Sequence, residues 1–130
     1  MTDKSDFLED TILNHVLRNV AYTPSVTVEV ALFTTLPGED GTGGVEVSGG
    51  SYARQTVTFA APVGGASSNQ GAITFPQATA NWGTVVGTGL YEDAGAGSNL
   101  LYFGALSTNK VVDTGDQLSF ANGALTVTEQ

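Results

Sequence analysis

Cysteine, positive charge and long apolar runs are all scarce in this chain of 130 residues. Cysteine is absent, so neither a disulfide framework nor a thiolate metal site holds the fold, and stability must come from packing and backbone hydrogen bonds. No apolar run approaches the roughly 20 residues that a membrane-spanning helix needs. The first residues also lack the basic segment followed by an apolar segment that is typical of a secretory signal. We therefore expect a protein that is neither secreted nor inserted in a membrane.

Positive charge is limited to four residues against 13 Asp and Glu, which gives a formal net charge of -9 at pH 7. The four cations, Lys4, Arg18, Arg54 and Lys110, are scattered along the chain, whereas nucleic-acid binding gains its affinity from clustered cations. The sequence therefore argues against a nucleic-acid partner. The acidity has two interpretations, which are solubility and complementarity to a basic partner surface.

One segment, Ser5 to Asn19, has the pattern of a helix. Ser5 or Asp6 can accept hydrogen bonds from first-turn amides, and Glu9 follows Asp6 at the capping-box spacing. Apolar residues recur at three- and four-residue spacing, namely Leu8, Ile12, Leu13, Val16, Leu17 and Val20. We favour the interpretation that this apolar stripe covers one end of a sheet. The alternative is that it docks on a neighbouring subunit.

The chain from about residue 26 to residue 130 has the pattern of short strands. In residues 26–33 and 53–59 apolar and polar side chains alternate, which predicts two half-buried strands that pair with each other. Six further strands separated by turn residues are predicted at residues 72–75, 84–91, 99–106, 110–112, 117–120 and 125–128. Asn122 and Gly123 favour a tight hairpin. The prediction is an all-β fold, a jelly-roll-like antiparallel β-sandwich of about eight strands with one N-terminal amphipathic helix, in a single domain over residues 1–130.

Two glycine-rich connections are candidate contact segments. Residues 37–44 form a surface loop in which Glu39 and Asp40 raise the question of calcium. The alternating ligands of an EF-hand are missing, and no Lys follows the glycines as in a phosphate-binding loop, so we expect a solvated loop able to lie on a neighbour. Residues 60–71 are expected to be a linker between the sheets that is mobile or held by a neighbour.

The large aromatic side chains are expected to fill the space between the sheets, and they are Phe75, Trp82, Tyr91, Phe103 and Phe120. For Trp82 a second interpretation is open. Together with Tyr91 or Tyr52 it would form a stacking platform for a host-surface glycan.

No set of residues has the spacing of a catalytic device. The single histidine, His15, lies at the edge of the helix stripe and is interpreted as a surface residue. The carboxylate pairs Asp113 with Asp116 and Glu92 with Asp93 lie among turn-forming residues, where Asp tends to bond its own backbone. We therefore expect a protein that is not an enzyme and that carries no metal and no cofactor.

A family likeness is spread over nearly the whole chain. Its stretches, which follow the N-terminal helix, are residues 30–35 (VALFTT), 46–55 (EVSGGSYARQ), 73–76 (ITFP), 80–85 (ANWGTV), 100–106 (LLYFGAL) and 115–120 (GDQLSF). With this combination the chain resembles a family of small virion proteins of tailed bacteriophages. Members are often labelled tail-fibre-like, and similar small sandwiches serve as capsid decoration, or cement, proteins.

The resemblance implies a structural virion protein. The preferred hypothesis is a cement protein on the outer surface of the head, a homotrimer that ties together junctions between major capsid protein subunits. The alternative is a tail-fibre or tail-associated adhesin module that binds the host surface, and a small hydrolase of surface polysaccharide is a third class. The residues proposed to make contacts are Leu8, Ile12, Leu13, Val16, Leu17, Pro37, Glu39, Asp40 and Trp82.

Overall fold

The computed structural model describes residues 1, 3–92 and 98–129, and within them the chain forms ten strands and one helix. In chain order these are β1 (Asp3–Lys4), α1 (Asp6–Arg18), β2 (Val28–Thr35), β3 (Val45–Glu46), β4 (Gln55–Val57), β5 (Ala66–Ser68), β6 (Ile73–Thr74), β7 (Gly83–Glu92), β8 (Leu100–Val112), β9 (Ser119–Phe120) and β10 (Thr126–Thr128). The predicted helix is confirmed as α1, and residues 94–97, the turn residues between the strands predicted at 84–91 and 99–106, lie outside the described residues. Over those residues, no helix is both long and apolar enough to cross a membrane.

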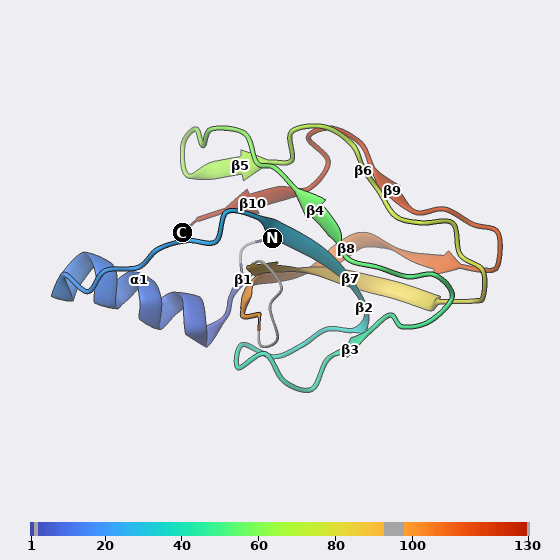
Figure 1. Cartoon of the computed structure of the whole chain (residues 1–130), viewed down its shortest axis with the longest axis horizontal. Coiled ribbons are helices and arrows are strands. Elements are labelled where there is room, and N and C mark those ends of the chain that lie inside the picture. The colour runs from blue at the N-terminus through green and yellow to red at the C-terminus, as the bar shows by residue number, and fades with distance from the viewer. Residues whose placement is uncertain (2, 93–97, 130) are drawn as a thin grey trace.

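The larger layer is an antiparallel sheet with the strand order β1-β8-β7-β2-β3, in which β4 also pairs with β2. The predicted pairing of the first two strands is confirmed, because β4 lies antiparallel to β2 with Val28 opposite Val57. The long strands β7 and β8 run side by side through the middle of Figure 1. Their alternation of side chains gives this sheet one face toward the core and one face away from it.

The smaller layer consists of two antiparallel ribbons, β5 with β10 and β6 with β9. Figure 1 shows these ribbons above the larger sheet. Between the layers, Val30, Leu32, Phe75 and Val85 are fully buried, and they form the centre of the main core. The fold is therefore all-β and sandwich-like with one helix near the N-terminus, as predicted, whereas the jelly-roll connectivity stays a prediction.

The other face of the larger sheet is covered by the chain's own loop and helix. Phe33 of β2 and Leu100 of β8 are buried on this face. A Cβ added to Gly87 would meet the Leu36 side chain and lie 2.6 Å from the Gly104 carbonyl oxygen of β8, so β7 needs glycine here. The start of α1 contacts β8, and its Leu8 is buried. The helix is thereby placed at the edge of the sandwich.

Three local predictions were wrong. Residues 60–71 are not a free linker, because they contain β5, which pairs with β10, and the buried Asn69. The Asn122-Gly123 turn joins β9 to β10 without making a hairpin, since these strands pair with β6 and β5. The strands predicted at 99–106 and 110–112 are one strand, β8, in which residues 106–109 bulge opposite Val86. In each case pairing with a distant strand decided the structure against the local turn residues.

Candidate interaction surface

The helix α1 is anchored to the body through its first turn. Ser5 is the N-cap, and its Oγ accepts a hydrogen bond from the Leu8 amide at 3.2 Å and donates one to the Leu100 carbonyl of β8. The Ser5 amide donates to the Leu101 carbonyl at 2.9 Å, and the Asp6 amide donates to the Glu39 carbonyl at 2.8 Å. Beyond this turn α1 extends away from the sheets (Figure 1). The anchor therefore fixes where the helix starts and leaves most of its length outside the sandwich.

The apolar stripe of α1 divides into two faces. Leu8 is 8% exposed and Ile12 is half-buried, so these two residues cover the edge of the sheet as the favoured interpretation expected. Leu13, Val16 and Leu17 are 54%, 69% and 74% exposed. These three do not cover the sheet, because on a helical wheel Val16 lies about 80°, Leu13 about 140° and Leu17 about 180° away from Leu8. These three side chains form the exposed apolar face of α1, and Val20, 45% exposed, follows just beyond the end of the helix.

The loop at residues 37–44 closes on itself. Pro37 is buried, and a Cβ on Gly44 would lie 2.9 Å from its Cα, which shows how closely the two ends of the loop approach. Asp40 Oδ1 accepts from the amide of Thr42 at 2.9 Å and from its hydroxyl at 2.8 Å. The hydrogen bond from the Thr42 backbone, followed by that from its side chain, holds the pKa of Asp40 below its ordinary value. Glu39 and Asp40 present the exposed charged side chains of this loop, and the described residues contain no cluster of three or more metal-ligating side chains.

Trp82 belongs to the core. Its side chain is 5% exposed, its indole N–H donates to the Gly50 carbonyl at 3.0 Å, and its ring meets Tyr52 edge-on with 5.5 Å between centroids. The ring faces are thus occupied by the protein itself. The stacking platform for a glycan has no support from this residue.

The Ser-Tyr-Ala-Arg stretch of the family likeness is also structural. The Arg54 guanidinium donates hydrogen bonds of 2.7 and 2.9 Å to the two carboxylate oxygens of Glu46. Its central carbon lies 3.8 Å from the centre of the Tyr91 ring. The Tyr52 hydroxyl donates to Glu46 at 2.8 Å and accepts the Leu32 amide at 3.0 Å. Burial raises the pKa of Tyr52 far above its ordinary value. These residues tie β3 and β4 to β2, and sequence reasoning alone had not assigned them this role.

The residues considered for catalysis lie in turns and at the end of the helix, where they contact backbone groups. His15 Nδ1 lies 3.0 Å from the Val20 carbonyl at the end of α1. Asp116 accepts the Asp113 amide at 2.9 Å inside a turn. Asp93, the expected partner of Glu92, lies outside the described residues. The side chains of His15 and Asp116 are therefore held by backbone groups of their own helix end and turn.

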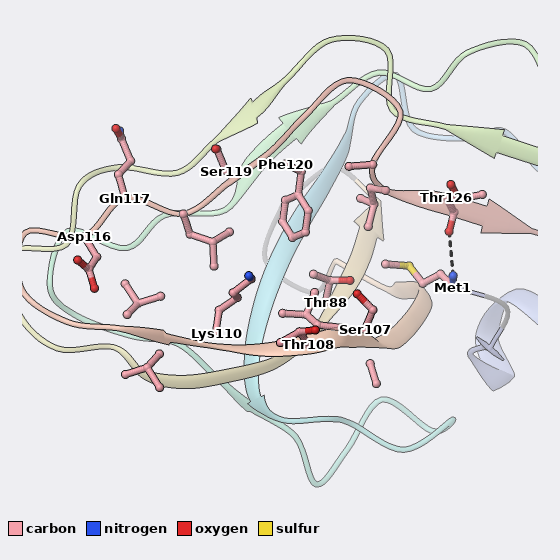
Figure 2. A pocket seen from close by; sticks show the side chains of 17 residues that line it. Met1, Thr88, Ser107, Thr108, Lys110, Asp116, Gln117, Ser119, Phe120 and Thr126 are labelled. Atoms are coloured by element: carbon pink, nitrogen blue, oxygen red, sulfur yellow. Dashed lines mark hydrogen bonds between the residues drawn. The ribbon is translucent and has the colours of Figure 1, made fainter.

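A groove lies along the sandwich between β8 and residues 116–126. Its volume is about 710 Å³, and it runs from Met1 and Thr126 at one end to Asp116 at the other (Figure 2). The apolar part of its lining consists of Met1, Ala105, Leu106, Val111, Val112, Leu118, Phe120, Ala124 and Leu125. Lys110 projects into the groove toward Phe120 (Figure 2). No pattern in the sequence indicated this groove, because its walls come from segments that only the fold brings together.

Comparison with known proteins identifies one family that matches nearly the whole chain. A family model described as podophage GP4 fiber I protein gp80 matches residues 3–128. No curated protein matches the chain. The matched range includes α1, both sheet layers and, except for Met1, every residue that lines the groove.

Proposed function

Because this chain belongs to the podophage GP4 fiber I protein gp80 family, we propose that it is a fibre component that holds its place in the virion through the exposed face of α1. The family is one of small tailed-phage virion proteins, and the chain is a structural protein of the virion. Its role is to bind neighbouring proteins and not to transform a substrate. The family description supports the fibre assignment, and the geometry of α1 supports the mode of attachment.

The observation that carries the proposal is the exposure of Leu13, Val16 and Leu17 on a helix whose start is rigidly fixed. Full burial of such a side chain stabilises by about 1.5–3 kcal/mol, so covering the exposed parts of these three is worth about 4 kcal/mol. A protein that remained alone would leave this contribution unused. A neighbour that covers the face would gain it.

The absence of catalysis is supported by how the polar side chains are used. The Glu46 carboxylate is taken up by Arg54 and Tyr52, and Asp40 and Asp116 by their own turns. Each of these three carboxylates therefore stabilises the fold. None of these groups converges with another on the groove to act as acid and base.

Incorporation into particles tests the proposal. We expect mass spectrometry of purified virions to find the chain, and labelled antibody to mark the fibres. A phage carrying Leu13→Ser with Leu17→Ser is expected to produce folded protein that is missing from its particles. Val26→Ser is the matched control, because Val26 is 96% exposed and lies outside α1. Absence of the wild-type chain from virions, or normal incorporation of the double variant, would refute the proposal.

Capsid decoration is the second candidate function. It is favoured by the shape of the molecule, since a small sandwich with a projecting helix suits a cap over junctions of the major capsid protein. Copy number separates the two roles. Hundreds of copies per particle, with label on the head, indicate decoration, and a handful, with label on the tail, indicate a fibre.

A further inference from the structure

We propose that the groove between β8 and residues 116–126 receives the exposed face of α1 from a second copy of this chain. The proposal rests on the proposed function, in which the α1 face is a contact surface, and it names the partner that covers this face. The observations that lead to it are the shape of the two surfaces, their charges and the direction in which α1 points.

The exposed face has the spacing of a docking helix. Leu13, Val16 and Leu17 stand at positions i, i+3 and i+4 of α1, which is the anchor spacing of an amphipathic helix that docks in a groove, and Val20 follows the left-handed C-cap Asn19. The groove offers Leu106 and Phe120, both only partly buried, beside the buried Leu118. Its volume of about 710 Å³ lies within the roughly 300–1,000 Å³ of pockets that take up ligands of several side chains' size. The exposed apolar residues of α1 therefore have apolar residues of the groove to pack against, and the groove is large enough to take up several side chains.

The charges of the two surfaces are complementary. The ammonium group of Lys110 makes no hydrogen bond or ion pair with any described residue, whereas Arg54 pairs with Glu46 and Lys4 pairs with Glu129. Lys110 therefore has an unpaired ammonium group in the groove, whose lining combines apolar residues with Asp116 and several hydroxyl side chains (Figure 2). On α1, Glu9 lies one turn before Leu13 on the same face and is exposed. A docked helix brings the Glu9 carboxylate to the Lys110 ammonium group. Ammonium and guanidinium groups are few on this protein, whose net charge is -9.

The helix that fills the groove has to come from another copy. In its own chain, α1 is fixed at Ser5 and extends away from the sandwich (Figure 1), and the groove begins at Met1 and runs in the other direction to Asp116 (Figure 2). Each copy thus carries one helix face and one separate groove. Such a contact joins two different surfaces, so copies arranged around a symmetry axis satisfy every helix and every groove in a closed assembly.

Oligomeric mass measures the proposed contact directly. We expect light scattering behind size exclusion to give the full chain a mass that is a multiple of 13.3 kDa. Leu17→Ser is expected to weaken self-association about tenfold, because Leu17 is 74% exposed in the single chain and buried in the assembly. Val26→Ser, at an exposed apolar residue outside both surfaces, is expected to leave the mass unchanged. Circular dichroism checks that each variant keeps its helix and strands.

A charge exchange tests the orientation of the docked helix. Lys110→Glu and Glu9→Lys are each expected to weaken self-association several-fold at low salt, and the chain with both changes is expected to recover most of the wild-type affinity. Additive losses in the double variant would overturn the pairing of these two residues. A wild-type chain that stays monomeric, or an oligomer that Leu17→Ser does not weaken, would overturn the proposal as a whole.

The same experiments separate this inference from the proposed function. If the chain is a monomer in solution but is present in virions and lost on changing α1, then a different virion protein covers the helix and only the self-docking is wrong. If the chain self-associates as expected but is missing from virions, then the proposed function is wrong.

Discussion

Replacing Asn69 by Ala is the sharpest test of how the smaller layer is held together. Asn69 is 1% exposed, and its Nδ2 donates to the carbonyls of Gly71 at 2.7 Å and Ala121 at 3.0 Å. Its Oδ1 accepts the amide of Leu125 at 2.8 Å. One side chain therefore joins the segment after β5 to the turn between β9 and β10. Truncation removes all three hydrogen bonds at once.

The expected loss of unfolding free energy is about 3 kcal/mol. A protein hydrogen bond contributes about 0.5–1.5 kcal/mol net, and a buried donor left without a partner costs about 1–3 kcal/mol. The Leu125 amide becomes such a donor, because Leu125 is buried and its amide has no other hydrogen-bond partner among the described residues. With an m-value of roughly 1.5 kcal/mol/M, the urea midpoint falls by about 2 M.

Urea unfolding followed by circular dichroism, at one fixed protein concentration, measures this loss. Asn122→Ala is the matched control, because the Asn122 Oδ1 accepts a single hydrogen bond, from the Gly71 amide at 2.8 Å, at an exposed position. We expect the control to lose less than about 1 kcal/mol. Equal losses for the two variants would show that Asn69 does not hold the layer as argued.

Two further predictions concern backbone strain and pH. Gly50→Ala places a Cβ 2.8 Å from the Trp82 indole nitrogen at a φ of +57°, so we expect a loss of about 3 kcal/mol. Gly49→Ala, at a φ of +72° with nothing within 4 Å, is expected to lose about 1 kcal/mol, and equal thermal shifts would contradict this. Burial alone would raise the pKa of Glu129. Hydrogen bonds from Lys4 and from the Tyr102 hydroxyl, together with the charge of Lys4, hold this pKa below its ordinary value. The stability that Glu129 contributes is therefore complete above its unfolded-state pKa and is lost as pH falls through its folded-state pKa. Between about pH 5 and pH 3 we therefore expect the wild type to lose more stability than Glu129→Gln. Parallel curves of stability against pH for the two proteins would refute this prediction.

Strands that carry their own alternation were predictable from the sequence. The pattern in residues 26–33 and 53–59 predicted β2 and β4 and their pairing, because apolar and polar side chains must separate to the two faces of a sheet. β1, β3 and β5 were missed. Each has only two or three residues, and β1 exists because Asp3 lies opposite Phe103, exactly one hundred positions further along the chain. Such strands are produced by the edge of the partner strand and leave no local pattern.

The candidate contact residues show the same limit. Side-chain chemistry predicted a surface role for Glu39 and Asp40 and a helix with an apolar stripe, and both features are present. It gave no means to tell that Pro37 is buried, because burial depends on the loop that folds over it, whereas the expectation that Trp82 fills the core is confirmed. Lys110 was no more than one of four scattered cations in the sequence. Only the fold places it in a groove.

The helix shows why an apolar stripe does not by itself identify what covers it. A stripe that packs on the chain's own sheet and a stripe that packs on a neighbour need the same leucines and valines at the same spacing. What separates them is the angle around the helix at which the anchor lies. Ser5 and Leu8 turn one side of α1 toward β8, and the face of Leu13 and Leu17 is thereby turned outward. The side chains on this outward face are exposed and are available to another molecule. They are apolar, although the chain is otherwise rich in acidic and small polar residues.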